Sequence, residues 1–231
     1  SPFDHAAQAA LYVPDHLPEP GDEAHTAALA LAVGRWASRL GGRTLVLTTT
    51  LRATAQMAQH LRAQVEQGRC APLQVLEQGR ASKRGLLRQF RGASDVAQVM
   101  IASASFWEGV DIAGDALQLL VIDKLPFPPP DDPLMQARGQ RLEAQGLNPF
   151  DDLWVPETAM ALKQGAGRLI RSETDRGVLV IGDRRLLTRS YGNRLLAALP
   201  DMRRLMGEAD MDAALDALVL TRSSTKDRTT T

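Results

Sequence analysis

The feature that most constrains the fold of this chain is a series of short apolar runs that alternate with helical patterns. The runs contain many β-branched residues and are apolar on both faces, as buried parallel strands are. They cover residues 44–49, 73–76, 97–102, 117–123 and 178–182. Helical spacing of apolar residues is found over 24–40, 51–66, 82–90, 133–145, 155–171 and 185–198. This alternation predicts an α/β class with a doubly wound, mostly parallel sheet.

The two ends of the chain do not share this alternation. Residues 1–21 contain four prolines and one short apolar run at 10–13, so we expect a lead-in with an edge strand, cut from something longer. Residues 22–200 are predicted to form one domain, because 231 residues leave little room for two. Residues 201–231 are predicted to form a helix and a polar tail, and we expect 223–231 to be disordered.

Composition narrows the class of protein. The chain has 27 basic and 27 acidic residues, so contact with nucleic acid would have to come from a local basic face. Its single cysteine, Cys70, cannot supply a disulfide framework, a four-cysteine zinc site or an iron–sulfur cluster within this chain. The sequence has neither a membrane-spanning apolar run nor a signal peptide. We therefore expect a protein of the reducing cytoplasm that makes no contact with a membrane.

The most informative segment is Gln164-Gly165-Ala166-Gly167-Arg168-Leu169-Ile170-Arg171, at the end of the helix predicted over 155–171. At about 100° per residue, Gln164, Arg168 and Arg171 share one face, opposite the apolar residues. Two guanidiniums and an amide so placed can meet a terminal phosphate and its attacking water, and can stabilise the charge of phosphoryl transfer. Gly165 and Gly167 weaken a helix, a cost that close approach of another group would offset. The alternative is that the two arginines form an ordinary solvated surface.

Three segments together resemble the motifs of one family. The pattern Q-x-x-G-R-x-x-R at 164–171 resembles motif VI of superfamily 2 helicases, in the form of the DinG/XPD family. S-A-S-F-W-E-G-V-D at 103–111 resembles motif V of that family, and K-L-P-F-P-P-P at 124–130 resembles the segment that follows it. Their order and spacing make the match specific. The resemblance extends from the N-terminus to about residue 200 and implies a second RecA-like helicase domain.

The resemblance also assigns roles to individual residues. The catalytic residues would be arginine fingers and an amide acting on ATP bound between two domains: Arg168, Arg171 and Gln164. The nucleotide contacts would be Gly109, Asp111 and Gly167. The motif V residues near DNA or the interdomain cleft would be Ser103, Ser105 and Glu108.

Further contacts to single-stranded DNA are expected where two earlier strands end. Residues 45–51 resemble motif IV, and the hydroxyls of Thr48 and Thr50 can hold phosphates or cap the next helix. Gln78 and Lys83, with Ser82 opening a helix, offer an amide, an ammonium, a hydroxyl and helix-terminal N–H groups to the same backbone.

Other parts of the helicase machinery are missing from the sequence. No G-x-x-x-x-G-K-[ST] motif is present, so we expect no ATP hydrolysis by this chain alone. The family pattern places the Walker motifs, the Mg²⁺ site and, in most members, an iron–sulfur cluster in a first RecA-like domain outside this chain. Asp22-Glu23-Ala24-His25 spells the DEAH box, but no apolar strand precedes it, and we expect Asp22 or Glu23 to begin a helix and no metal to bind.

The predicted function is the C-terminal half of an ATP-dependent DNA helicase motor. Its partners would be single-stranded DNA and the first RecA-like domain of the same protein, and the family resemblance implies travel from 5′ to 3′. One alternative is a non-catalytic module that binds single-stranded nucleic acid or docks a partner. Another is an RNA-directed relative, because contacts to the phosphate backbone do not distinguish the two sugars.

Overall fold

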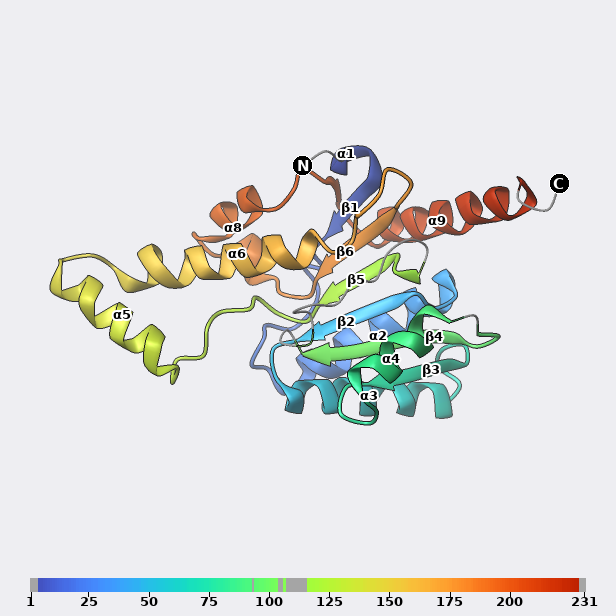
Figure 1. Ribbon diagram of the computed structural model, residues 1–231, viewed down its shortest axis with the longest axis horizontal. Coiled ribbons are helices and arrows are strands. Elements are labelled where there is room, and N and C mark those ends of the chain that lie inside the picture. Colours follow the sequence, from blue (N-terminus) through green and yellow to red (C-terminus); the bar gives the residue numbers. More distant parts are fainter. Residues whose placement is uncertain (1–3, 93, 104–105, 107–115, 229–231) are drawn as a thin grey trace.

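The computed structural model describes residues 4–92, 94–103, 106 and 116–228, with only the backbone course for 222–228. The described residues form one seven-stranded sheet whose strands are all parallel, in the order β3-β4-β2-β5-β6-β1-β7 (Figure 1). The strands are β1 (Ala9–Tyr12), β2 (Thr44–Thr48), β3 (Leu73–Glu77), β4 (Ala97–Ser103), β5 (Leu119–Ile122), β6 (Gly177–Ile181) and β7 (Arg203–Leu205). The predicted α/β class and doubly wound sheet are confirmed, and the five predicted strands are β2 to β6.

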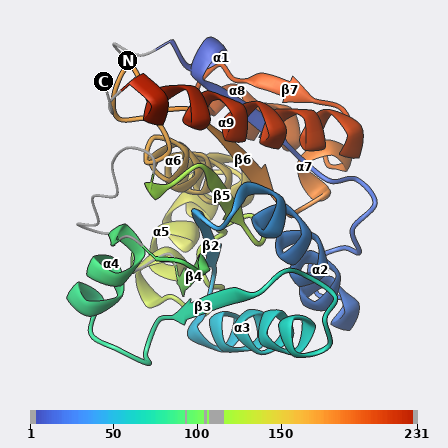
Figure 2. The ribbon, with the colours of Figure 1, turned by 90° about the vertical axis from the view of Figure 1, so that its right-hand side faces the viewer.

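Helices cover both faces of this sheet (Figures 1 and 2). They are α1 (His5–Gln8), α2 (Glu23–Leu40), α3 (Leu51–Glu66), α4 (Lys83–Arg91), α5 (Pro133–Ala144), the π-helical turns η3 (Phe150–Trp154), α6 (Val155–Ala166), α7 (Arg185–Thr188), α8 (Gly192–Ala198) and α9 (Glu208–Arg228). One apolar cluster packs α4, α6 and α8 against the sheet, with Phe90 and Leu162 among its buried members. The opposite cluster packs α2, α3 and α9, with Trp36, Leu61 and Leu215 fully buried.

Local capping explains why the helix starts were predictable. The Asp22 carboxylate accepts a hydrogen bond from the Ala24 N–H at 2.8 Å, so the expectation that this acid begins a helix is confirmed. Thr50 and Ser82 cap α3 and α4 in a similar way. Each hydroxyl oxygen accepts a hydrogen bond, at 3.1 Å, from the backbone N–H of the residue three positions later in the chain. The helix α2 ends at Gly41, whose φ of 74° is the left-handed conformation that glycine adopts without strain.

The ends of the chain differ from their predictions. The expected edge strand is β1, and it lies inside the sheet, paired with β6 on one side and β7 on the other. The prolines that suggested an edge surround the strand, at 2, 14, 18 and 20, so they remove no hydrogen bond from its ladder. At the other end, α9 continues to Arg228, across most of the segment that we expected to be disordered.

Two predicted helices are shorter than their apolar periodicity suggested. The helix expected over 155–171 ends at Ala166, and the one expected over 185–198 is divided into α7 and α8. The division allows Gly192 to sit on the backbone of α7, where an added Cβ would lie 2.1 Å from the Leu186 carbonyl oxygen. Close backbone packing of this kind is available only to glycine.

All seven strands run in the same direction, so their carboxyl ends meet at one edge of the sheet. The segments that leave this edge include those after β2, β3, β4, β5 and β6. This edge is where the topology gathers the loops that contain most of the predicted site residues.

Candidate functional site

A cleft of about 620 Å³ lies at the carboxyl edge of the sheet. Its walls come from the end of β2, the end of β5 and the segment after it, and the last turns of α6. Among the predicted site residues, Thr48, Gln164 and Arg168 line it. The structure therefore brings together residues from motif IV and motif VI that are more than a hundred positions apart.

Gln164 and Arg168 reach the cleft from different backbone conformations. Gln164 is an exposed residue in the last turn of α6, and Arg168 is half-buried in the turn that follows. The Arg168 N–H donates to the Gly165 carbonyl and the Leu169 N–H to the Ala166 carbonyl, each three residues back. The helix thus tightens as it ends, and the calculation of one shared helical face does not apply beyond Ala166.

Arg171 leaves the helix because another acceptor holds its backbone. The Asp175 carboxylate accepts hydrogen bonds from the Arg171 N–H at 2.8 Å, the Ser172 N–H at 3.0 Å and the Ser172 hydroxyl at 2.7 Å. The buried Gln8 amide donates to the carbonyls of Ser172 and Asp175 at 2.7 and 3.1 Å. Residues before β1 therefore fix the loop after motif VI, and neither Arg171 nor Gly167 lines the cleft.

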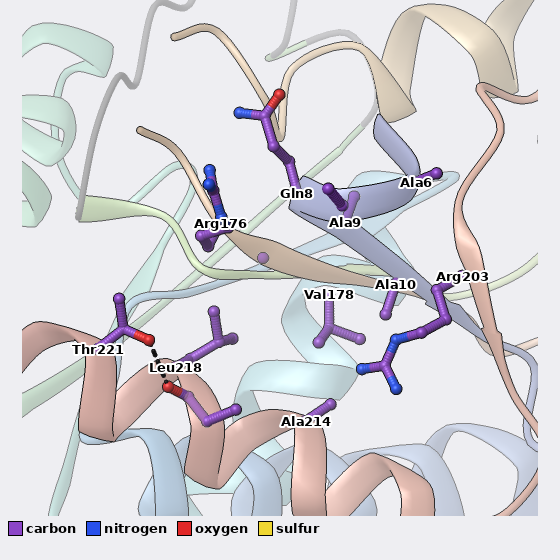
Figure 3. A pocket seen from close by; sticks show the side chains of 13 residues that line it. Ala6, Gln8, Ala9, Ala10, Arg176, Val178, Arg203, Ala214, Leu218 and Thr221 are labelled. Carbon is purple, nitrogen blue, oxygen red and sulfur yellow. Dashed lines mark hydrogen bonds between the residues drawn. The ribbon is translucent and has the colours of Figure 1, made fainter. Parts of the chain in front are cut away.

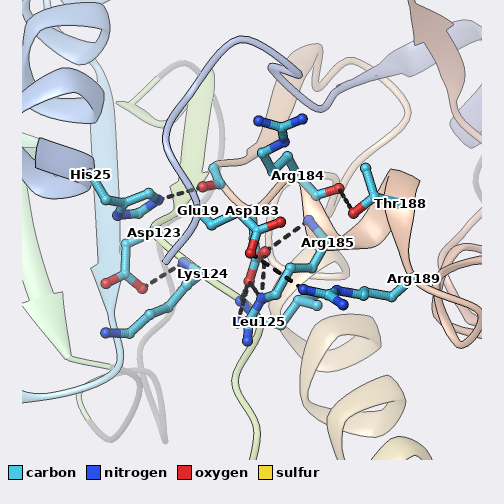
Figure 4. A network of polar contacts seen from close by, with 11 residues as sticks. Glu19, His25, Asp123, Lys124, Leu125, Asp183, Arg184, Arg185, Thr188 and Arg189 are labelled. Atoms are coloured by element: carbon cyan, nitrogen blue, oxygen red, sulfur yellow. Dashed lines mark hydrogen bonds and ion pairs between the residues drawn. The ribbon is translucent and has the colours of Figure 1, made fainter. Parts of the chain in front are cut away.

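Two buried carboxylates organise the wall between β5 and β6 (Figure 4). Asp183 follows β6 and accepts the Leu125 N–H at 2.9 Å and the Arg185 N–H at 3.0 Å. The Arg185 guanidinium donates hydrogen bonds to the same carboxylate from two nitrogens, at 2.9 and 2.7 Å. This hydrogen bonding holds the pKa of Arg185 above its usual value. The backbone of the Leu125 segment is thereby tied to the end of the neighbouring strand.

Asp123 follows β5, lines the cleft and is only 5% exposed. Burial raises the pKa of its carboxyl to about 7, and the Asp183 carboxylate acts in the same direction. The neighbouring Lys124 charge and backbone N–H donors from Lys124 and Thr49 oppose this shift. The cleft therefore contains a carboxyl group that changes its protonation near neutral pH.

A second group of predicted residues gathers around the ends of β3 and β4. The Gln78 side-chain oxygen accepts both the N–H and the hydroxyl of Ser103, at 2.7 and 3.0 Å. The Lys83 ammonium lies 5.1 Å from the centre of the Phe106 ring, a cation–π contact. Two of the residues predicted to bind DNA, Gln78 and Ser103, are thus joined directly beyond two adjacent strands, and a third, Lys83, begins the helix that follows β3.

The two threonines predicted to hold phosphates are engaged within the fold. Thr48 is buried, and its hydroxyl lies 2.7 Å from the Thr54 hydroxyl and 3.1 Å from the Thr50 carbonyl oxygen. Thr50 is exposed and caps α3. Their roles at DNA stay predictions, as do those of Ser105, Glu108, Gly109 and Asp111, which lie outside the described residues.

Sequence reasoning missed the acidic residues of this edge. Asp123 and Asp183 each follow an apolar strand, which is the position where ligands of parallel sheets gather, and this signal could have identified both. The resemblance assigns no role to Asp175, although its carboxylate fixes the course of the chain after Ile170. His25, in the DEAH-like string, is buried on α2 with its Nε2 2.7 Å from the Gly182 carbonyl oxygen.

The opposite edge of the sheet has a much smaller hollow (Figure 3). Its volume is about 150 Å³, and alanine residues of α1, β1 and α9 form much of its wall, with Arg176 and Arg203 at its margins. Drug-sized ligands usually occupy roughly 300–1,000 Å³. This hollow contains none of the predicted site residues, so the carboxyl edge is the better candidate for function.

The described part of the chain has neither a membrane-spanning helix nor a group of side chains suited to a metal ion. No helix there combines the length and apolar content that crossing a bilayer requires. The same residues contain no group of three or more histidine, cysteine or acidic side chains placed to hold a metal ion.

Comparison with known proteins agrees with the resemblance seen in the motifs. A family model described as Helicase C-terminal domain matches residues 34–202. The chain is similar to the ATP-dependent DNA helicase YoaA of Escherichia coli K12, with 44% identity over 87% of this chain and 30% of that protein. It is similar to the ATP-dependent helicase DinG of Mycobacterium tuberculosis, with 38% identity over 94% of this chain and 32% of that protein. A solved XPD helicase has a similar fold, with a TM-score of 0.56 and 18% identity, covering 86% of this chain and 36% of that one. The chain thus spans about a third of the length of these proteins.

Proposed function

Because the chain belongs to the Helicase C-terminal domain family and has the motifs of the DinG/XPD group, we propose that it is the second RecA-like domain of an ATP-dependent DNA helicase. In this role ATP and Mg²⁺ lie between this domain and a first RecA-like domain elsewhere in the same protein. An iron–sulfur cluster, if the whole protein has one, belongs to that other part, since Cys70 is the one cysteine of this sequence.

The observation that carries the proposal is the meeting of Gln164 and Arg168 in the cleft at the carboxyl edge. A guanidinium and an amide that flank a cleft of about 620 Å³ suit the terminal phosphate of a nucleotide presented by another domain. Arg168 supplies positive charge to the transferring phosphoryl group, and Gln164 orients the attacking water. Arg171 lies outside the lining of the cleft, on the loop that Asp175 and Gln8 fix, and in this proposal it approaches the nucleotide as the second finger when the other domain closes on this edge.

The nucleic-acid part of the proposal is based on Gln78 and Ser103, which are hydrogen-bonded to each other, and on Lys83 at the start of α4, all of which follow strands that end at the same edge of the sheet. Amide, ammonium and hydroxyl groups of this kind bind a phosphate backbone without reading its sequence. The relatives named as DNA helicases favour DNA over RNA as the strand. Opening and closing of the cleft with ATP turnover then moves the strand, in the 5′ to 3′ direction.

The test is DNA-stimulated ATP hydrolysis by the whole protein, comparing wild type with Arg168→Ala at saturating ATP and single-stranded DNA. Loss of a finger arginine lowers turnover by about 1,000-fold or more in well-studied phosphoryl transfer enzymes, so we expect a fall of at least roughly 100-fold. Binding of ATP and DNA should persist. Arg69→Ala is the matched control, because Arg69 is an exposed arginine beyond the end of α3 and far in the chain from these motifs. Unchanged turnover in Arg168→Ala, or an equal loss in Arg69→Ala, would refute the assignment.

A further inference from the structure

The outer surface of α4 carries an unusual concentration of positive charge. Residues 78–94 contain five basic residues and no acidic one, although the whole chain is neutral. Four of the five lie on α4 and are exposed: Lys83, Arg84, Arg88 and Arg91. The fifth, Arg80, precedes the helix and pairs with Glu77 at 3.1 Å.

The three arginines of α4 occupy one face of the helix. Arg84, Arg88 and Arg91 are spaced by four and three residues, which places them within about 60° of one another. The buried residues Leu86 and Phe90, 3% and 5% exposed, lie on the opposite side and pack against the sheet. The arginine face therefore points to solvent and spans about 10 Å along the helix, at 1.5 Å per residue.

Helix stability does not account for this arrangement. Lys83 and Arg84 occupy the first turn, where the helix dipole disfavours positive charge, and that turn has no acidic residue. Arg84 and Arg88 are four residues apart, so they repel each other on the helix surface. Only the cations of the last turn, Arg88 and Arg91, are favoured by the dipole. A face that costs the helix stability at one end indicates an anionic partner.

Arginines on other helices differ from those of α4 because they pair with carboxylates. Arginines on α2, α3, α5 and α8, among them Arg39, Arg62 and Arg194, form ion pairs with carboxylates. Within the described residues, Arg84, Arg88 and Arg91 form no ion pair with a carboxylate. Their guanidiniums are therefore available to phosphate groups, which they can bind with two parallel hydrogen bonds.

We propose that the Arg84–Arg88–Arg91 face of α4 is an additional contact for the phosphate backbone of DNA, outside the cleft. It continues from the group formed by Gln78, Ser103 and Lys83, because Lys83 begins the helix whose outer face carries the arginines. The inference rests on the proposed function, since it extends the path of the same DNA. A length of about 10 Å covers more than one phosphate of a strand, whose charges are about 3.4 Å apart along the axis of a duplex.

The experiment measures DNA binding by the whole protein with the substitutions Arg84→Gln, Arg88→Gln and Arg91→Gln combined. Glutamine keeps helix propensity and removes the charge, and circular dichroism checks the fold. Fluorescein-labelled oligothymidylate and a duplex of equal length are titrated at several NaCl concentrations. The control combines Arg69→Gln, Arg141→Gln and Arg203→Gln, which remove the same charge from exposed positions elsewhere.

We expect the α4 variant to lose roughly tenfold or more in DNA affinity at about 0.15 M salt. For single strands, the negative slope of log K against log salt concentration should become less steep by about 2. The control should change little. Equal losses in the two variants, or unchanged binding by the α4 variant, would overturn this inference while leaving the helicase proposal in place. An α4 variant that keeps DNA binding but loses binding to polyglutamate would show an acidic protein partner instead. Wild-type protein that binds neither DNA would remove the helicase proposal itself.

Discussion

Removal of the Asp183 carboxylate tests how the cleft wall is held. This side chain is fully buried and accepts hydrogen bonds from the N–H groups of Leu125 and Arg185 and from the Arg185 guanidinium. In Asp183→Ala, two backbone donors and one cation lose their acceptor at the same time. The segment after β5, which forms one side of the cleft, loses its tie to β6.

The size of the expected loss in unfolding free energy depends on the burial of Asp183. Breaking a buried ion pair by removing one partner costs about 3–5 kcal/mol, and an unmet hydrogen bond to a charged group costs about 1.5–3 kcal/mol. The Arg185 side chain is 25% exposed and can turn partly toward water, which lowers the total. We expect Asp183→Ala to reduce the free energy of unfolding by about 4 kcal/mol, a large part of the 5–15 kcal/mol typical of a domain.

The assay is urea unfolding of this chain followed by circular dichroism, with Asp216→Ala as the matched control. Asp216 also takes two hydrogen bonds from one guanidinium, that of Arg39, at 2.6 Å each, but on an exposed surface. Because solvent screens that pair, the control should leave the unfolding midpoint nearly unchanged. Similar losses in the two variants, or a loss below about 1 kcal/mol in Asp183→Ala, would show that burial does not set the strength of this contact.

Three further predictions concern the protonation of Asp123 and the close packing of Gly192 and Gly165. Burial raises the pKa of Asp123 to about 7, so between about pH 4 and 7 the Asp123 carboxyl keeps its proton in the folded state and releases it in the unfolded state. The free energy of unfolding therefore falls as the pH rises through this window. Asp123→Asn removes this pH-dependent contribution to the free energy of unfolding. Between pH 5 and pH 8, the free energy of unfolding of the wild type should therefore fall by about 2–3 kcal/mol relative to that of the variant, as measured by urea unfolding. A difference between the two proteins that does not change with pH would contradict the raised pKa. Gly192→Ala should destabilise by about 2 kcal/mol or more, because its Cβ would lie 2.1 Å from the Leu186 carbonyl oxygen. Gly165→Ala should instead stabilise α6 by up to about 1 kcal/mol in thermal unfolding, since its Cβ would meet only the Ile122 side chain at 3.5 Å; a loss would mean that the space is tighter than the structure indicates.

Local signals in the sequence were enough to predict much of this fold. The apolar runs predicted five strands, and the caps Asp22, Thr50 and Ser82 place the starts of three helices within one residue of prediction. The edge where Thr48, Gln164 and Arg168 meet is also the carboxyl edge, where ligands of parallel sheets gather.

What the sequence could not predict depends on contacts between distant residues. The helix containing Gln164 ends at Ala166, and the N–H groups of Arg171 and Ser172 then donate to the Asp175 carboxylate instead of to helical carbonyls. Apolar periodicity does not contain that competition. The interior position of β1 depends on pairing with β6 and β7, which no local pattern specifies. Asp123 is a different case, because the apolar run 117–123 includes it, whereas in the structure β5 ends at Ile122 and Asp123 is the first polar group beyond the strand.

The insertion of β1 between β6 and β7 has a consequence for how the chain folds. The strands β3, β4, β2 and β5 are close in sequence and can pair once the first half of the chain is made, whereas β1 must wait for partners synthesised much later. Closing so long a loop carries an entropic cost before any pairing repays it. We therefore expect β1, β6 and β7 to form one cooperative unit, so that removal of β1 or of β7 unfolds the same side of the sheet.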